Sequence, residues 1–186
     1  FRRVLFRSPV WVIRALKQAL SIDGRESELE ALLTSDNQAP LVNLVLLPGK
    51  QADTSEFVSG QASPIGFVMR DGDPGKLTQV RDGQMRVQDQ GSQLSALMLS
   101  RARKTLPGEL WLDMCAGPGG KAALLAAEAK ISRAHFFANE IAPHRAKLVK
   151  QALSKVDPEV EVSVGDGREF GTDFQEKFDR IMLDAP

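Results

Sequence analysis

The fold is decided by the stretch Leu110-Trp111-Leu112-Asp113-Met114-Cys115-Ala116-Gly117-Pro118-Gly119-Gly120-Lys121. An apolar run ends at Asp113, a glycine-rich turn follows, and a helical pattern begins at Gly120. Gly117, Gly119 and Ala122 have the spacing of turns in which glycine permits a tight bend, close approach of a ligand to the backbone and close helix packing. A strand before this turn and a helix after it favour a ligand-binding turn over a purely structural one.

Apolar runs and helical patterns alternate on both sides of this turn. Strands are expected at residues 110–114, 135–138, 160–164 and 180–183, and helices at 92–103, 120–129 and 143–153. Leu94, Leu97 and Met98 have core spacing in the first of these helices, and Trp111 is expected in the core. This alternation predicts βαβ units and therefore an α/β fold, a Rossmann-like parallel sheet with flanking helices.

The residues before this region predict smaller units. One helical pattern begins near Ser8-Pro9, a second runs through 26–33, and a strand is expected at 41–47. Short apolar pieces and turn signals follow up to residue 80. We therefore expect a helical lead-in over 1–35 that is the remnant of a preceding domain, a small α+β unit over 36–80, and the Rossmann-like part over 81–186. We treat the chain as an excerpt of a longer protein.

An acidic side chain lies at the end of each of the four strands expected in the Rossmann-like part: Asp113, Glu140, Asp166 and Asp184. Ligands of such sheets bind beyond the carboxyl ends of the strands, so these acids are candidate site residues. Glu140 lies 21 residues after Gly119, the separation at which an acid binds ribose hydroxyls. Glu140 could also complement a helix dipole, and Asp166 could simply form a turn.

A cluster of carboxylates repels itself unless a ligand brings donors or positive charge. S-adenosylmethionine brings a sulfonium cation, an amino group, ribose hydroxyls and an adenine amine, whereas the pyrophosphate of a dinucleotide would be repelled. The acids therefore favour S-adenosylmethionine over NAD as the cofactor.

Composition excludes several classes of protein. The 186 residues contain 24 basic and 24 acidic side chains and one cysteine, Cys115. No disulfide or cysteine-rich zinc site can form within the chain, which fits a reducing, cytoplasmic location. No apolar run is long enough to cross a membrane, and His135 and His144 lack a third metal ligand nearby. With no excess of positive charge, an RNA partner could use only a local basic surface, for which the candidates are Arg70, Lys76, Arg81, Arg86, Arg101, Arg103 and Lys104.

Several motifs together resemble the RsmB/Sun family of RNA (cytosine-5) methyltransferases. They are Val87 to Leu94, Cys115 to Lys121, Asn139 to Arg145, Asp166-Gly167-Arg168 and Asp184-Ala185-Pro186. The resemblance implies an incomplete methyltransferase fold, with S-adenosylmethionine as cofactor and RNA, specifically ribosomal RNA, as partner in rRNA processing. It also implies that the small α+β unit over 36–80 binds RNA. It implies that the methionine part of the cofactor is wrapped by Cys115, Ala116, Gly117, Pro118, Gly119, Gly120 and Lys121. It further implies that Glu140 holds the ribose, Asp166 the adenine end, and Asp184 the rim between cofactor and target base.

The sequence departs from the family pattern in two places. The family more often has Ala at the position of Gly117, a change that we expect to preserve the turn. The family also continues its Asp-Ala-Pro motif into Cys and has its nucleophilic Cys in a later motif, and neither is present. Formation of 5-methylcytosine needs a thiolate that adds to the base, so we expect no catalytic residue and no activity in these 186 residues.

Three alternatives stay open: methylation of an exocyclic amine, an NAD-dependent oxidoreductase, and a non-catalytic RNA-binding module. No metal or membrane partner is expected, and we expect a monomer.

Overall fold

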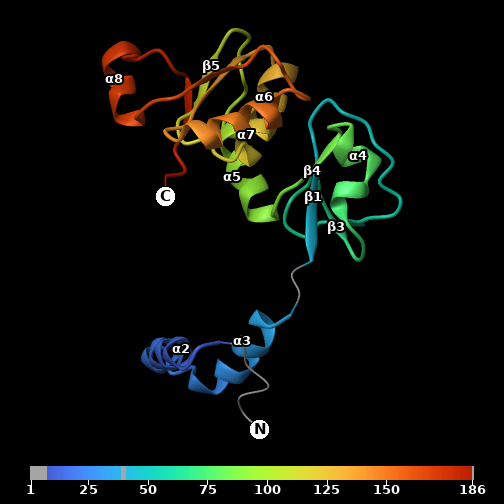
Figure 1. Cartoon of the computed structure of the whole chain (residues 1–186), viewed down its shortest axis with the longest axis vertical. Helices are drawn as coiled ribbons and strands as arrows, with labels where there is room; N and C mark the ends of the chain where they lie inside the picture. The colour runs from blue at the N-terminus through green and yellow to red at the C-terminus, as the bar shows by residue number, and fades with distance from the viewer. Residues whose placement is uncertain (1–7, 39–40, 186) are drawn as a thin grey trace. The chain divides into compact units, whose positions relative to one another are not determined.

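The computed structural model describes residues 8–38 and 41–185 (Figure 1). The start of the lead-in, residues 39 and 40, and Pro186 of the last motif lie outside these ranges. The chain forms two compact units, Phe1–Pro40 and Leu41–Pro186. The first contains helix α2 (Val10–Ile22), a 3₁₀ turn (Glu26–Glu28) and helix α3 (Leu29–Asp36). Pro9 precedes α2, as expected for a residue that cannot donate a helical hydrogen bond.

The second unit begins with an antiparallel sheet in the order β2-β3-β1-β4. Its strands are β1 (Val42–Leu46), β2 (Val58–Ser59), β3 (Gly66–Met69) and β4 (Met85–Val87). A 3₁₀ turn (Pro74–Lys76) and helix α4 (Thr78–Arg81) connect β3 to β4. Leu44, Met69 and Met85 form its buried core. Because β4 pairs with β1, this sheet contains residues from both sides of the domain boundary expected after residue 80, and the domain limits stay a prediction.

A parallel sheet in the order β7-β6-β5-β8 follows. Its strands are β5 (Leu110–Asp113), β6 (His135–Asn139), β7 (Glu161–Ser163) and β8 (Arg180–Met182). The connecting helices are α5 (Gln90–Arg101), α6 (Gly120–Ile131), α7 (Pro143–Leu153), a 3₁₀ turn (Gly167–Glu169) and α8 (Phe170–Asp173). The chain moves outward from β5 to β7 and then returns to the other side of β5. Ligands bind at such a switch point in open α/β sheets.

Helix α6 is buried on every side from Ala122 to Ala129. It contacts β5 and β6 and lies between α5 and α7. Five of these eight residues are alanines, and small side chains let the neighbouring helices approach. Apart from Glu128, which pairs with Arg101, this stretch is apolar all round, and such a helix is stable only when it is enclosed.

The expected α/β architecture is confirmed, and the seven elements expected in the Rossmann-like part lie within two residues of their expected limits. The 3₁₀ turn Gly167–Glu169 and helix α8 were not expected. Trp111 and the α7 residues Ala146, Val149 and Leu153 are buried, as expected. The expectation for Met98 is wrong, because its side chain is 74% exposed. Leu97 is buried as expected, and Ala96 is buried beside it.

Candidate functional site

The glycine-rich turn between β5 and α6 has the geometry that its spacing predicts. Gly119 has φ of +99°, a conformation that L side chains rarely adopt. A Cβ atom on Gly119 would lie 2.7 Å from the Cβ of Ala152 and 3.1 Å from the Cα of Val149 in α7. Glycine is therefore needed here both for the bend and for the close packing of α7.

Glu140 is tied to the same turn from the end of β6. Its side chain accepts hydrogen bonds from the backbone N–H of Gly117 at 2.9 Å and of Ala142 at 3.0 Å. Arg145 in α7 donates to the carbonyl oxygen of Gly117 at 2.7 Å and lies 3.5 Å from Glu140 Oε2. Glu140 is only 2% exposed, so these contacts fix a carboxylate beside the turn.

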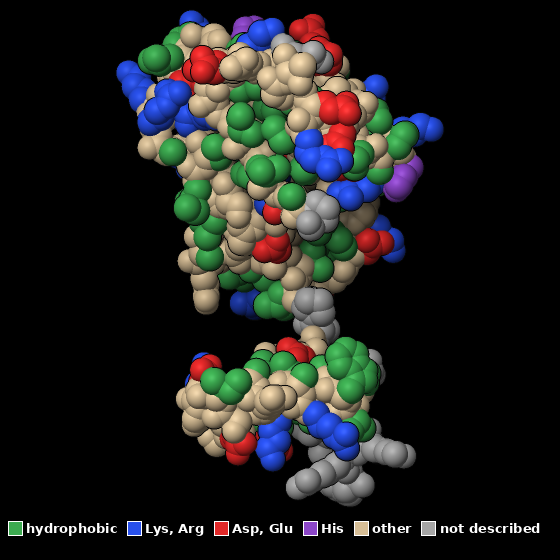
Figure 2. Space-filling model, turned by 90° about the vertical axis from the view of Figure 1, so that its left-hand side faces the viewer, with side chains coloured by type: hydrophobic (Ala, Val, Ile, Leu, Met, Phe, Trp, Pro, Cys, Tyr) green, Lys and Arg blue, Asp and Glu red, His purple; other side chains and the backbone are tan. Residues whose placement is uncertain are grey.

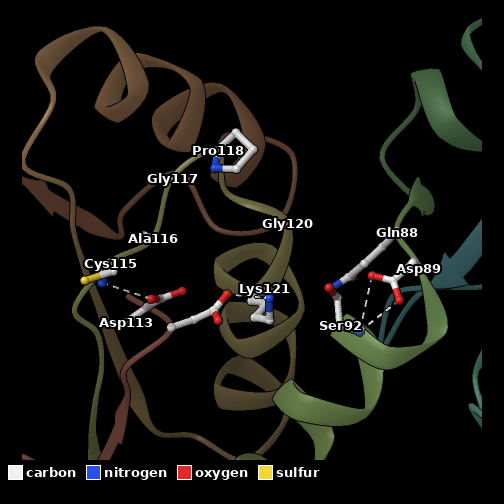
Figure 3. A pocket seen from close by; sticks show the side chains of 11 residues that line it. Gln88, Asp89, Ser92, Asp113, Cys115, Ala116, Gly117, Pro118, Gly120 and Lys121 are labelled. Atoms are coloured by element: carbon white, nitrogen blue, oxygen red, sulfur yellow. Dashed lines mark hydrogen bonds and ion pairs between the residues drawn. The ribbon is translucent and has the colours of Figure 1, made fainter. Parts of the chain in front are cut away.

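The turn forms one wall of a pocket of about 280 Å³ (Figure 3). The pocket is lined by residues at the start of α5, at the end of β5, in the turn and after β8: Gln88, Asp89, Ser92, Asp113, Cys115, Ala116, Gly117, Pro118, Gly120, Lys121 and Asp184. Lys121 Nζ lies 2.6 Å from Asp184 Oδ2. We call this the turn pocket. Its lining offers both charges and several hydrogen-bonding groups.

Asp113 gives the turn pocket an unusual acid. It is 1% exposed, and burial raises the pKa of its carboxyl to about 7, against the hydrogen bond from the Cys115 N–H, which lowers it. The charges of Asp184 and Glu140 also raise this pKa, and Lys121 lowers it. A cation bound here would favour the carboxylate form of Asp113.

A second pocket of about 400 Å³ is lined in part by Met114 and Cys115. It contains the acids from the next two strands together with apolar groups, and its other lining residues are Asn139, Glu140, Ile141, Arg145, Gly165, Asp166, Gly167, Arg168, Leu183 and Ala185. We call this the strand-end pocket. Cys115 lines both pockets, so one elongated ligand could occupy the two.

Asp166 is held in the orientation of a turn-forming residue. It accepts hydrogen bonds from the backbone N–H of Arg168 at 3.0 Å and from the guanidinium of the same residue. These bonds lower the pKa of Asp166 to about 2. Arg168 is otherwise exposed to solvent, so Asp166 stays a carboxylate at the edge of the strand-end pocket.

The four strand-end acids therefore divide between two joined pockets. Asp113 and Asp184 line the turn pocket, while Glu140 and Asp166 line the strand-end pocket. Sequence reasoning treated them as one cleft. It also missed the pocket-lining roles of Gln88, Asp89, Ser92, Asn139 and Arg145, although Asp89 has the local pattern of a helix N-cap and accepts from Gly91 and Ser92.

Three of the seven basic residues considered for RNA have partners within the protein. Arg86 donates to the carbonyl of Ala152, Arg101 pairs with Glu128, and Arg103 pairs with Glu109. Figure 2 shows lysine and arginine side chains at several separate places on the larger unit, among acidic and hydrophobic ones. The face in that view offers no single basic surface.

Two classes of site find no support in the part of the chain that is described. Residues 8–38 and 41–185 contain no group of three or more His, Cys, Asp or Glu side chains that could hold a metal ion. Within the same ranges no helix is both long and apolar enough to span a membrane.

Residues 102–186 match a family model described as 16S rRNA methyltransferase RsmB/F. The chain belongs to the RsmB/F family. RsmB/F proteins are S-adenosylmethionine-dependent methyltransferases, so the cofactor class favoured by the strand-end acids is confirmed for the family.

Relatives of this RsmB/F chain extend the match to almost its full length. A protein of Mycobacterium tuberculosis whose name places it among methyltransferases is 43% identical, over 96% of this chain and 39% of its own length. Ribosomal RNA small subunit methyltransferase B of Serratia proteamaculans is 31% identical, over 96% of this chain and 42% of its own length. The crystal structure of PH0851 has a TM-score of 0.79 at 22% identity, over 99% of this chain and 42% of that one, which shows a shared fold. The chain thus spans about two fifths of these proteins.

Proposed function

We propose that this RsmB/F chain is the cofactor-binding part of an S-adenosylmethionine-dependent enzyme that forms 5-methylcytosine in RNA, with ribosomal RNA as substrate. The observation that supports the proposal is the pair of pockets that share Cys115, one lined by Asp113 and Asp184 and the other by Glu140 and Asp166. Such an arrangement suits a ligand with a nucleoside at one end and a charged group at the other.

The residues present fit S-adenosylmethionine. Glu140 accepts two backbone N–H bonds and keeps lone pairs for ribose hydroxyls. Asp166 and the apolar side chain of Ile141 suit an adenine end in the strand-end pocket. The turn from Cys115 to Lys121 suits the methionine end, and Asp184 suits the rim towards the target base. When bound, the cofactor supplies an electrophilic methyl group.

Methylation at carbon 5 of cytosine needs a thiolate that first adds at carbon 6. Cys115 is poorly suited to this role, because burial, and after it the charge of Asp113, raise the pKa of its thiol. It is also the one cysteine of these 186 residues. We therefore propose that a nucleophilic cysteine lies in a later part of the protein and that this chain alone is inactive. Incubation with RNA and methyl-labelled cofactor should give no labelled cytosine, and its appearance would overturn this part of the proposal.

The substrate is inferred from the family and from relatives named as ribosomal RNA small subunit methyltransferase B. We propose that the α+β unit expected over 36–80 contributes RNA contacts and that the protein acts as a cytoplasmic monomer. Electrophoretic mobility shifts with ribosomal RNA fragments at two salt concentrations test the first point, because contacts to phosphate weaken as salt rises.

Calorimetry with S-adenosylhomocysteine, the demethylated cofactor, tests the cofactor site. We expect it to bind, NADH not to bind, and Glu140→Ala to weaken binding about tenfold or more, since hydrogen bonds to a charged group are lost. Glu159→Ala, at an exposed site outside both pockets, is the matched control. Binding of NADH alone would favour a nicotinamide oxidoreductase. RNA binding with no adenosyl ligand, unchanged in Glu140→Ala, would favour a non-catalytic RNA-binding module.

A further inference from the structure

Gln88 is a buried amide without a partner at the edge of the turn pocket. Gln88 is only 7% exposed. Neither Oε1 nor Nε2 has a hydrogen-bond partner among the residues that the structure describes. Buried polar groups in folded proteins are nearly always paired, because an unpaired one has lost its hydrogen bonds to water. An orphaned amide that lines a pocket therefore points to a ligand.

Two hydrogen bonds hold the backbone of Gln88 in place. The N–H of Gln88 donates to the carbonyl of Asn43 in β1 at 3.0 Å. Its carbonyl accepts from Nε2 of the fully buried Gln93 at 2.8 Å. Both strand and helix thus fix the residue between β4 and α5, and Figure 3 shows its amide directed into the pocket towards Lys121. The backbone that presents this amide is therefore fixed at the edge of the pocket.

An amide presents a donor and an acceptor side by side, so its best partner presents an acceptor and a donor at the same spacing. The α-amino-acid group of the proposed cofactor does so, because its carboxylate accepts and its ammonium donates. Charges in the same pocket agree with this partner: Lys121 suits a carboxylate and Asp113 an ammonium. The nucleoside end has its own acids, Glu140 and Asp166, on the far side of Cys115.

We propose that Gln88 binds the amino-acid end of S-adenosylmethionine, with Nε2 donating to the carboxylate and Oε1 accepting from the ammonium. This inference rests on the proposed function and adds to it a residue outside the glycine turn. Gln88 thereby links the antiparallel sheet to the cofactor, since the backbone that presents its side chain is hydrogen-bonded to β1.

Two ligands that differ only at the amino-acid end test the proposal by calorimetry on the 186-residue chain. S-adenosylhomocysteine has this end, and 5′-methylthioadenosine lacks it. In Gln88→Leu we expect affinity for S-adenosylhomocysteine to fall about tenfold and affinity for methylthioadenosine to stay unchanged. Gln88→Glu should lose more of the first affinity, because a carboxylate replaces the donor and repels the ligand carboxylate. Gln84→Leu, at a half-buried site outside the pocket, should bind both ligands as the wild type does.

Thermal unfolding of each variant shows whether it is folded at the temperature of the titration. Equal affinity of folded Gln88→Leu and wild type for S-adenosylhomocysteine would overturn the role of Gln88 and leave the cofactor site intact; the edge of the target base would then be the next partner to test. Equal loss for both ligands would also overturn it. Failure of the wild type to bind either ligand would overturn the proposed function and this inference together.

Discussion

The backbone N–H of Gly117 donates to Oε2 of Glu140 at 2.9 Å, and a Cβ atom on Gly117 would lie 2.3 Å from that same oxygen. The glycine turn and the acid after β6 are thus in direct contact. The same Cβ atom would lie 2.6 Å from Nε of Arg145. The two side chains can approach the turn this closely only because residue 117 has no side chain.

Gly117→Ala should therefore keep the turn but displace Glu140 and Arg145. The φ angle of Gly117 is not positive, so alanine fits the backbone, as expected from the frequent alanine at this position in the family. We expect affinity for S-adenosylhomocysteine to fall about tenfold, roughly 1.4 kcal/mol, with less than about 1 kcal/mol lost in unfolding free energy. Calorimetry and urea unfolding measure the two effects. Gly171→Ala, where a Cβ atom meets nothing within 4 Å, is the control, and unchanged affinity in Gly117→Ala would show that Glu140 does not hold the ligand.

Asp113 should make the protein less stable as the pH rises. Burial raises its pKa from 3.8 to about 7, so between these values the folded state binds more protons than the unfolded state. The free energy of unfolding therefore falls with rising pH over this window, and the full penalty is present above about pH 7.

Asp113→Asn removes this penalty. We expect the variant to match the wild type near pH 4 and to be more stable by roughly 2 to 4 kcal/mol at pH 8. Urea unfolding at both values measures the difference, with the exposed Asp82→Asn as control. A difference of the same size at both pH values would mean that packing, not ionisation, distinguishes the two side chains.

Glu109 should make the protein less stable as the pH falls into the acid range. It accepts from Arg180 Nε at 2.8 Å, from Trp111 Nε1 at 2.9 Å, and from Arg103 and the Leu106 N–H. Burial alone would raise its pKa, but these hydrogen bonds outweigh burial and lower the pKa from 4.5 to about 2. The stabilisation is complete above the unfolded pKa and is lost as pH falls towards 2.

Glu109→Gln should cost about 3 to 5 kcal/mol of unfolding free energy at pH 7, because Arg180 is left buried without its counter-charge. The cost should shrink in acid, as the wild-type carboxylate is protonated. Denaturant unfolding at pH 7 and pH 3 compares the two conditions. The same substitution at Glu28, whose pair with Arg25 is exposed, should have no measurable effect, and equal stability of Glu109→Gln and wild type at pH 7 would contradict the prediction.

Local sequence patterns predicted the parts of this molecule that are determined locally. The glycine spacing of the turn, the helix after it and the acid at each strand end all follow from residues a few positions apart. Gln88 was missed as a pocket residue because strand pairing brings Asn43 to it, and no local pattern shows that its amide lacks a partner. Arg180 was expected only as the start of a strand, yet it bonds to Leu99, Ser100 and Arg103, about 80 residues earlier. Met98 was misplaced because helical spacing does not reveal which apolar face meets the sheet.

Strand β8 should promote self-association of the isolated 186-residue chain, in contrast to the monomer proposed for the whole protein. It lies at one edge of the parallel sheet and pairs with β5 on one side, with no strand on its other side among the described residues. Ile181 is 46% exposed and Leu183 is 63% exposed. An apolar edge strand with unpaired backbone groups is a template for pairing with another chain, and a charge on such a strand opposes that pairing.

We expect light scattering to show concentration-dependent association of the wild type and less of it in Ile181→Lys. Leu148→Lys, at a similarly exposed position on helix α7 (44% exposed), is the control for added charge. An equal reduction in both variants would attribute the effect to net charge and not to the free edge of β8.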